Sequence, residues 1–135
     1  MGRRHKNLFV YKLSEEILLD IYYLTKKYPD NEKTNFISQM RRAATSIVLN
    51  IVEGCARKST KLLSNFFEYA YGSSKELKEL INLSNKLDYI TIFEYERMNK
   101  KIDILSAKLY LFLRSIEKDI GDKFYQSRNR RLNQI

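Results

Sequence analysis

The chain has 135 residues, of which 44% are hydrophobic and 30% charged, so it can form one domain with a core but not two. Its single proline and four glycines provide too few turns for an all-β or α/β fold and favour long helices. One cysteine excludes an intramolecular disulfide, and no apolar run reaches the roughly 18–20 residues of a membrane span. We therefore expect a cytoplasmic protein.

The formal net charge of +9 is concentrated at the two ends of the sequence. We divide the chain into a basic N-terminal segment (1–10), a helical body (11–120) and a basic tail (121–135) that we expect to be mobile. Two interpretations remain open: the ends are solubilising tails, or they are arms that contact phosphates. The arginines that would form such arms are Arg3, Arg4, Arg128, Arg130 and Arg131.

The first predicted helix runs from Tyr11 to Tyr28. Ser14 is a candidate N-cap, because the two glutamates that follow it would complement the helix dipole. Apolar residues then recur at helical spacing. Pro29 ends the helix, since the residue before a proline is pushed out of the α region.

The second predicted helix runs from Asn35 to Glu53. Residues 43–52 carry no charge, and a helix that is apolar all round is buried all round. In a lone bundle each helix keeps one wet face, so we predict that this helix also packs against another copy of the chain. The residues expected at that contact are Ala44, Ile47, Val48, Ile51 and Val52.

The third predicted helix spans Thr60–Leu87 and is opened by Ser59 or Thr60. Gly72 in its middle predicts a bend or a close helix crossing. The fourth starts at Thr91, which forms a capping box with Glu94, and runs to Ile120, with Gly121 as its C-cap. Short connections between such helices predict an all-α, antiparallel, up-down-up-down four-helix bundle.

Residues that carry catalytic or metal chemistry are scarce. The chain has one histidine, His5, and one cysteine, Cys55, which is too little for a zinc or di-iron site. We expect no enzyme activity, no metal and no cofactor. Asn50 and Glu53 could bind a ligand, but we favour a buried polar network that fixes helix register. Cys55 is interpreted as a packing residue rather than a reactive thiol.

Two basic clusters flank the uncharged run of the second helix. Arg41 and Arg42 precede it, and Arg57, Lys58 and Lys61 follow it. In a cyclic oligomer each cluster would become a ring of positive charge suited to a phosphate backbone. The alternative is that these side chains are solvated or form intramolecular ion pairs.

The segment Arg41-Arg42-Ala43-Ala44-Thr45-Ser46-Ile47-Val48-Leu49-Asn50-Ile51-Val52-Glu53-Gly54, followed by Arg57-Lys58-Ser59, closely resembles the signature of the "four helix bundle protein" family. These proteins are encoded by intervening sequences in bacterial large-subunit ribosomal RNA genes. Further similarity covers roughly residues 8 to 118. Cys55 and Ala56 depart from the pattern, and the tail after Gly121 is not part of it.

The resemblance implies a four-helix bundle assembled into a homopentamer around a central channel. A relative, the accessory protein of diversity-generating retroelements, resembles a basic pentameric barrel that binds nucleic acid and partners a reverse transcriptase. By this match, Arg41, Arg42, Arg57 and Lys58 are the positions expected to contact nucleic acid. The pentameric number follows from the resemblance alone.

Two functional hypotheses follow. The first is an oligomeric bundle that binds RNA or DNA, without base-specific contacts, through its basic clusters. The second is a scaffold that recruits a protein partner, such as a nucleic-acid enzyme, and makes no nucleic-acid contact itself.

Overall fold

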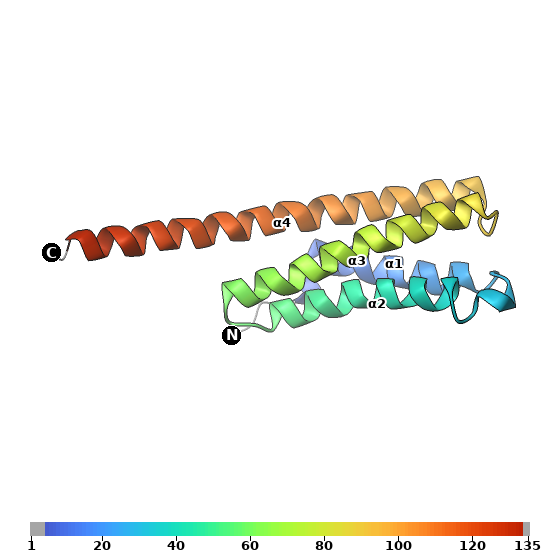
Figure 1. Cartoon of the computed structure of the whole chain (residues 1–135), viewed down its shortest axis with the longest axis horizontal. Helices are drawn as coiled ribbons and strands as arrows, with labels where there is room; N and C mark the ends of the chain where they lie inside the picture. The colour runs from blue at the N-terminus through green and yellow to red at the C-terminus, as the bar shows by residue number, and fades with distance from the viewer. Residues whose placement is uncertain (1–4, 134–135) are drawn as a thin grey trace.

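The computed structural model describes residues 5–133, except for the side chains of residues 7, 122–125, 127 and 131–133. Within that range the chain forms four long helices and no strand. Figure 1 shows successive helices running in opposite directions, as the sequence predicts. The elements are η1 (His5–Asn7), α1 (Phe9–Thr25), η2 (Asp30–Glu32), α2 (Phe36–Cys55), α3 (Thr60–Lys86) and α4 (Ile92–Asn133).

The helices form a ring in which each packs against its neighbours, α1 on α2, α2 on α3, α3 on α4 and α4 on α1. Apolar residues at helical spacing turn one stripe of each helix into the shared core. None of the described helices is long and apolar enough to cross a membrane. The largest fully buried side chains are Ile17, Ile21, Met40, Ile47, Ile51, Leu63, Phe67, Leu77, Ile81, Ile102, Leu105 and Leu109.

The N-cap residues predicted for the third and fourth helices are found at the starts of α3 and α4. The Ser59 hydroxyl accepts a hydrogen bond from the Leu62 amide at the start of α3. At the start of α4, the Thr91 amide donates to Glu94 and the Glu94 amide donates to the Thr91 hydroxyl. The capping box expected from the sequence is thereby confirmed.

The predicted start of the first helix is wrong. α1 begins at Phe9, and Leu8 is its N-cap residue in an extended conformation. Ser14 lies inside the helix, where its buried hydroxyl donates to the Tyr11 carbonyl. This hydrogen bond lies inside the helix, so Ser14 does not cap the start of α1.

The close helix crossing predicted at Gly72 is found at a different glycine. A Cβ atom added at Gly72 would meet nothing within 4 Å. A Cβ added at Gly54 would lie 2.9 Å from Phe67 Cδ1 and 3.1 Å from Phe66 Cβ. Gly54 is therefore a position where α2 lies so close to α3 that a Cβ atom would force Phe66 and Phe67 to move.

The predicted end of the fourth helix is also wrong. α4 continues through Gly121 to Asn133, and no described glycine has the positive φ that a left-handed C-cap requires. No proline follows to stop the helix, so the cost of one glycine, about 1 kcal/mol, does not end it. We call residues 121–133 of α4, the described part of the predicted tail, the overhang, because Figure 1 shows the C-terminal part of α4 extending beyond the other helices.

Candidate nucleic-acid interface

Arg41 is held between α1 and α2. Its Nε donates to the Thr25 hydroxyl at 3.0 Å, and its guanidinium carbon lies 4.5 Å from the centre of the Tyr22 ring. These contacts fix the side chain and give it a structural role in joining the two helices. Arg42, the next residue, is exposed and forms no ion pair among the described side chains.

A shallow groove of about 590 Å³ lies beside these two arginines. Hydroxyl and amide groups line it together with the arginines, and no carboxylate does. The lining residues are Tyr22, Ser38, Arg41, Arg42, Thr45, Ser46, Leu49 and Asn50. This composition gives the outer face of α2 a small basic surface with several hydrogen-bonding groups.

The second predicted cluster lies at the other end of α2. Arg57 pairs with Glu53 at 2.6 Å and lies 5.1 Å from the Phe66 ring centre, so part of its charge is neutralised within the chain. Lys58 and Lys61 are exposed and make no ion pair among the described side chains. Arg42 and Arg57 are fifteen positions apart, or about 22 Å along a helix, so the two clusters form separate surfaces.

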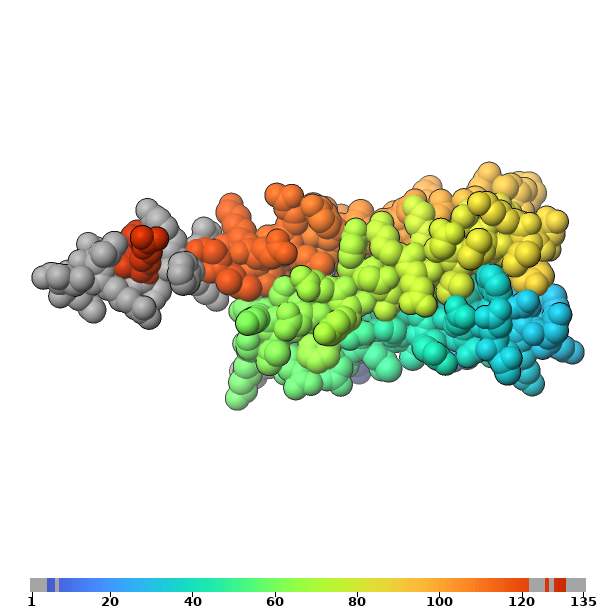
Figure 2. Space-filling model, in the orientation of Figure 1, coloured from blue at the N-terminus to red at the C-terminus, as the bar shows by residue number. Residues whose placement is uncertain are grey.

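The arginines expected in the tail lie on a helix. Arg128 and Arg130 are exposed on the overhang. The side chain of Arg131, and Arg3 and Arg4 altogether, lie outside the described residues, so their predicted contacts with phosphates stay predictions. Figure 2 shows α4, in orange, projecting past the α2–α3 turn, in green.

Three segments of the sequence carry most of the positive charge, and their described parts lie toward one end of the bundle (Figure 1). Residues 1–6, 53–61 and 121–135 contain ten lysines and arginines against two acidic residues, whereas the remainder contains fifteen against fourteen. Eight of the nine net charges therefore belong to these three segments. η1 packs against α2, and the overhang leaves the bundle on the side of the α2–α3 turn (Figure 1). We call this region, with Lys6, Lys58, Lys61 and the overhang, the basic end.

The residues predicted to contact another copy do not share one surface. Ala44, Ile47 and Ile51 are at most 1% exposed and belong to the core of their own chain, where another copy cannot reach them. Val48 and Val52 are half-buried, and their predicted role stays a prediction. The exposed apolar side chain on this helix is Leu49, which the sequence analysis did not select.

The polar network predicted around Asn50 is present in part. Asn50 Nδ2 donates to the carbonyl and hydroxyl oxygens of Ser46, and the Ser46 hydroxyl contacts the Ser73 hydroxyl of α3 at 2.9 Å. This network links α2 to α3. Glu53 is exposed and pairs with Arg57, so it lies outside the network. Cys55 is 1% exposed, in agreement with a packing role.

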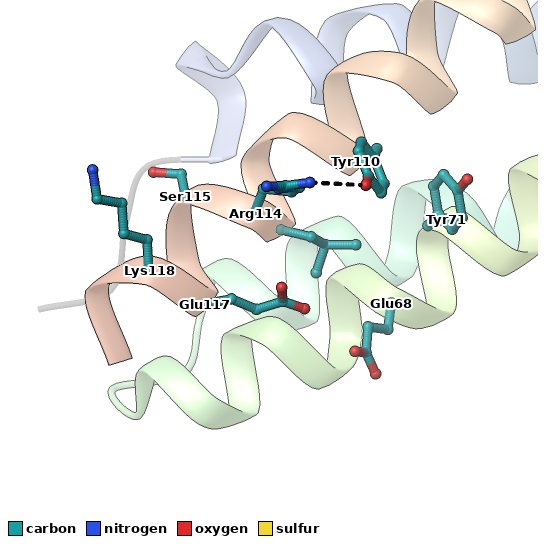
Figure 3. A pocket seen from close by; sticks show the side chains of 8 residues that line it. Glu68, Tyr71, Tyr110, Arg114, Ser115, Glu117 and Lys118 are labelled. Carbon is teal, nitrogen blue, oxygen red and sulfur yellow. Dashed lines mark hydrogen bonds between the residues drawn. The ribbon is translucent and has the colours of Figure 1, made fainter. Parts of the chain in front are cut away.

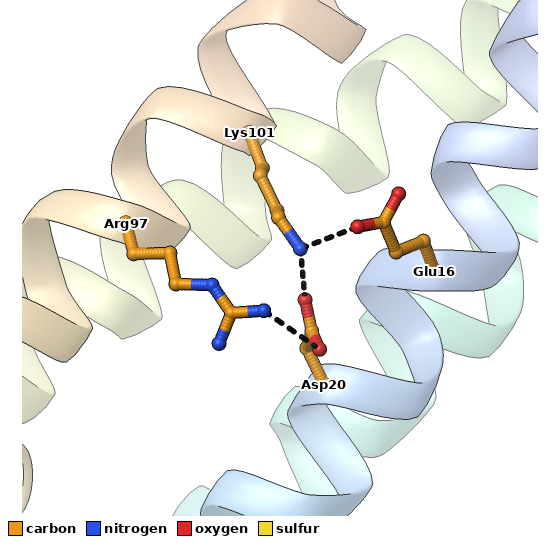
Figure 4. A network of polar contacts seen from close by, with 4 residues as sticks. All are labelled: Glu16, Asp20, Arg97 and Lys101. Atoms are coloured by element: carbon orange, nitrogen blue, oxygen red, sulfur yellow. Dashed lines mark hydrogen bonds and ion pairs between the residues drawn. The ribbon is translucent and has the colours of Figure 1, made fainter.

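A network of ion pairs that the sequence analysis missed joins α1 to α4 (Figure 4). Lys101 Nζ lies 2.7 Å from both Glu16 and Asp20, and Arg97 lies 3.8 Å from Asp20. The hydrogen bond from Lys101 lowers the pKa of Glu16. Burial alone would lower the pKa of Lys101, but its bonds to Asp20 and Glu16 outweigh burial and raise it.

A groove between α3 and α4 was also missed. It encloses about 970 Å³, and Tyr71 of α3 and Tyr110 of α4 lie side by side in it (Figure 3). The only local signal in the sequence is a cation four residues after each tyrosine, Lys75 and Arg114. That spacing places cation and ring on the same face of a helix.

No group of three or more histidine, cysteine, aspartate or glutamate side chains that could hold a metal ion occurs among the described residues. The surfaces that stand out are instead cationic or aromatic. They can hold anions and flat rings by electrostatic attraction and stacking.

Comparison with known proteins agrees with this architecture. The family described as 23S rRNA-intervening sequence protein matches residues 6–111, and no curated protein matches the chain. A crystal structure from Bacteroides thetaiotaomicron, of a protein with unknown function from the S23 ribosomal protein family, is similar with a TM-score of 0.72 and 25% identity. The match covers 78% of this chain and 95% of that one. The family match spans well over half of the chain, and the chain therefore belongs to the 23S rRNA-intervening sequence protein family.

Proposed function

We propose that the protein is a non-enzymatic, self-associating bundle that binds nucleic acid through its basic end. The observation that carries this proposal is the charge distribution, since eight of nine net positive charges fall in three segments of the chain. The described parts of these segments lie toward one end of the bundle (Figure 1). Exposed lysines and arginines without carboxylate partners gain free energy by displacing counterions from a phosphate backbone.

The family favours RNA as the first ligand to test, because its name refers to the intervening sequences of 23S rRNA. No base-reading motif is visible in the chain. Contacts with phosphates position a nucleic acid but do not specify its sequence. We therefore expect binding with little sequence preference and a strong dependence on salt.

The experiment is a titration of labelled structured RNA, and of duplex DNA of equal length, at several salt concentrations. The logarithm of the binding constant should fall linearly with the logarithm of salt concentration, by about 0.7–0.9 per neutralised phosphate. The variant Lys58→Glu/Lys61→Glu should bind more weakly and with a shallower slope.

The matched control is Lys86→Glu/Lys100→Glu, which changes the net charge equally at exposed positions outside the basic end. It should retain most of the affinity. Equal losses in the two variants would show that only total charge matters and would contradict the assignment to the basic end. Absence of binding at low salt would contradict nucleic-acid binding altogether.

Self-association is part of the proposal because apolar side chains remain exposed on the single chain. Of the fourteen large hydrophobic residues exposed in the described part, ten lie on α1 and α4, among them Leu19, Tyr23, Phe93 and Leu111. Contact with another copy would remove this surface from water. Sedimentation velocity at several concentrations measures the subunit number, for which the family resemblance implies five.

The same apolar surface favours a second candidate function, a scaffold that recruits a protein partner. Co-purification from lysate with and without nuclease separates the two functions. A protein that stays bound after nuclease treatment, together with no RNA binding by the purified chain, favours the scaffold.

A further inference from the structure

Tyr71 and Tyr110 form an aromatic pair between α3 and α4, away from the α1–α2 face. Their ring centres are 6.1 Å apart and their planes are inclined by 42°. Tyr110 is 46% exposed and Tyr71 is half-buried. Tyr110 therefore presents ring surface to solvent, while Tyr71 packs partly against the core and closes the inner side of the pair.

Each ring of this pair has a cation beside it. Lys75 Nζ lies 5.4 Å from the centre of the Tyr71 ring. The Arg114 guanidinium lies 5.9 Å from the centre of the Tyr110 ring, and its Nη1 donates to the Tyr110 hydroxyl at 3.3 Å. Neither cation forms an ion pair among the described side chains. Both charges remain available to an anion that approaches the rings.

Two neighbouring hollows share the two rings as lining, and we call the two hollows together the groove. The larger hollow, of about 970 Å³, extends along α4 to Lys118, and a smaller one of about 300 Å³ extends the other way to Asp103. Tyr71 and Tyr110 line both hollows. Asp103 and Lys118 are fifteen positions apart, which corresponds to about 22 Å of helix. A groove of this length, with aromatic rings in its middle, suits an extended chain with flat side groups.

We propose that this groove binds unpaired nucleotides of single-stranded nucleic acid, with a base stacked on the Tyr71–Tyr110 pair. Phosphates on either side would lie near Lys75, Arg114 and Lys118, which flank the rings along the groove. Aromatic stacking beside cations is how proteins hold single strands without reading their sequence. The inference rests on the proposed nucleic-acid binding, but it concerns a different surface from the basic end.

Two carboxylates in the larger hollow favour a single strand over a duplex. Glu68 and Glu117 lie in the groove beside the aromatic pair (Figure 3). They would repel a duplex backbone that lay along the groove. They can accept hydrogen bonds from the exocyclic amino group of a base that turns inward, and a single strand can turn its bases inward while its phosphates stay at the rim.

The test compares two oligomers that carry the same number of phosphates. One is an oligodeoxyadenylate, and the other has the same length but abasic sugars. The wild-type protein should bind the adenine-containing oligomer more tightly. Replacing both rings, Tyr71→Leu/Tyr110→Leu, should weaken that binding by about tenfold per tyrosine and leave binding of the abasic oligomer unchanged.

The matched control is Tyr69→Leu on α3. Tyr69 is 64% exposed and lines neither hollow, so it is an exposed tyrosine outside the groove. Its replacement should not alter the preference for bases. Far-UV circular dichroism verifies that each variant keeps its helical content, which we expect because Tyr110 and Tyr69 lie outside the core and because leucine keeps an apolar side chain where Tyr71 packs against it.

A second measurement places the base at the ring itself. The chain has no tryptophan, so Tyr110→Trp introduces a single reporter that can still stack. Its fluorescence should be quenched by the adenine-containing oligomer and not by the abasic one.

Equal binding of the two oligomers by the wild type, or equal quenching by both, would overturn the stacking site even if duplex and structured RNA still bind at the basic end. If the wild-type protein bound neither the oligomers nor structured RNA nor duplex DNA, the proposed function would be overturned as well.

Discussion

Between α2 and α3 there is no room for one additional carbon atom at Gly54, whereas between α1 and α4 charged side chains reach across the surface to one another. Contact between helices is most extensive for α2–α3 and least extensive for α1–α4. Close apolar packing is insensitive to salt, while exposed ion pairs are screened by it. The α2–α3 side is therefore held by close packing, and the α1–α4 side is held in part by ion pairs whose strength depends on salt.

The largest loss of unfolding free energy is expected from Gly54→Ala. The new methyl group would force Phe66 and Phe67 to move, and overpacking of this kind costs about 1–3 kcal/mol. Gly72→Ala is the matched control, since it adds the same group in a helix where nothing lies within 4 Å. It should stabilise the protein by about 0.5–1 kcal/mol. Urea unfolding measures both changes, and equal changes for the two variants would contradict the difference in packing.

A smaller effect is expected from Lys101→Met, which removes the cation shared by Glu16 and Asp20. We expect a loss of about 1 kcal/mol, the upper range for an ion pair near the surface. This lysine side chain is 18% exposed. Lys78→Met breaks a pair with Asp103 at 2.5 Å whose partners are 39% and 46% exposed, and it should cost less. The free energy of unfolding of the wild type, Lys101→Met and Lys78→Met is measured at low and at high salt. The loss of unfolding free energy caused by Lys101→Met should become smaller as salt rises.

The smallest effect is expected on the dependence of the unfolding free energy on pH in the acidic range. The pKa of Glu16 is lowered in the folded chain by its bond to Lys101. Its stabilising contribution is therefore present above the ordinary pKa of a glutamate side chain and is lost as pH falls below that value toward the lowered pKa of the folded chain. Glu16→Gln should flatten the decline of the unfolding free energy with acid. An unchanged pH profile would mean that this ion pair contributes nothing to stability.

Most helix boundaries could be predicted because their signals are local. The Thr91–Glu94 capping box and the Ser59 cap lie within four residues of the ends they define, so the sequence alone indicates them. Gly72 and Gly54 show the opposite case. Both are helical glycines, and only the neighbouring helix determines which of them must lack a side chain.

Less of the candidate site could be predicted from the sequence. Composition identified the basic residues, and Arg42, Lys58 and Lys61 are indeed exposed. The contacts that hold Arg41 against Tyr22 and Thr25 depend on how α1 packs on α2. The pairs between Glu16, Asp20 and Lys101 join residues 81 and 85 positions apart, for which a single sequence contains no signal.

That long separation has a consequence for the order of folding. Connections of only a few residues join α2 to α3 and α3 to α4, so these pairs can form at little cost in loop entropy. The ion pairs between α1 and α4 join residues 81 and 85 positions apart, and contacts between such distant residues form slowly. We therefore expect α1 to dock on α4 late. Removal of the Lys101 ammonium should then speed unfolding while leaving the folding rate almost unchanged.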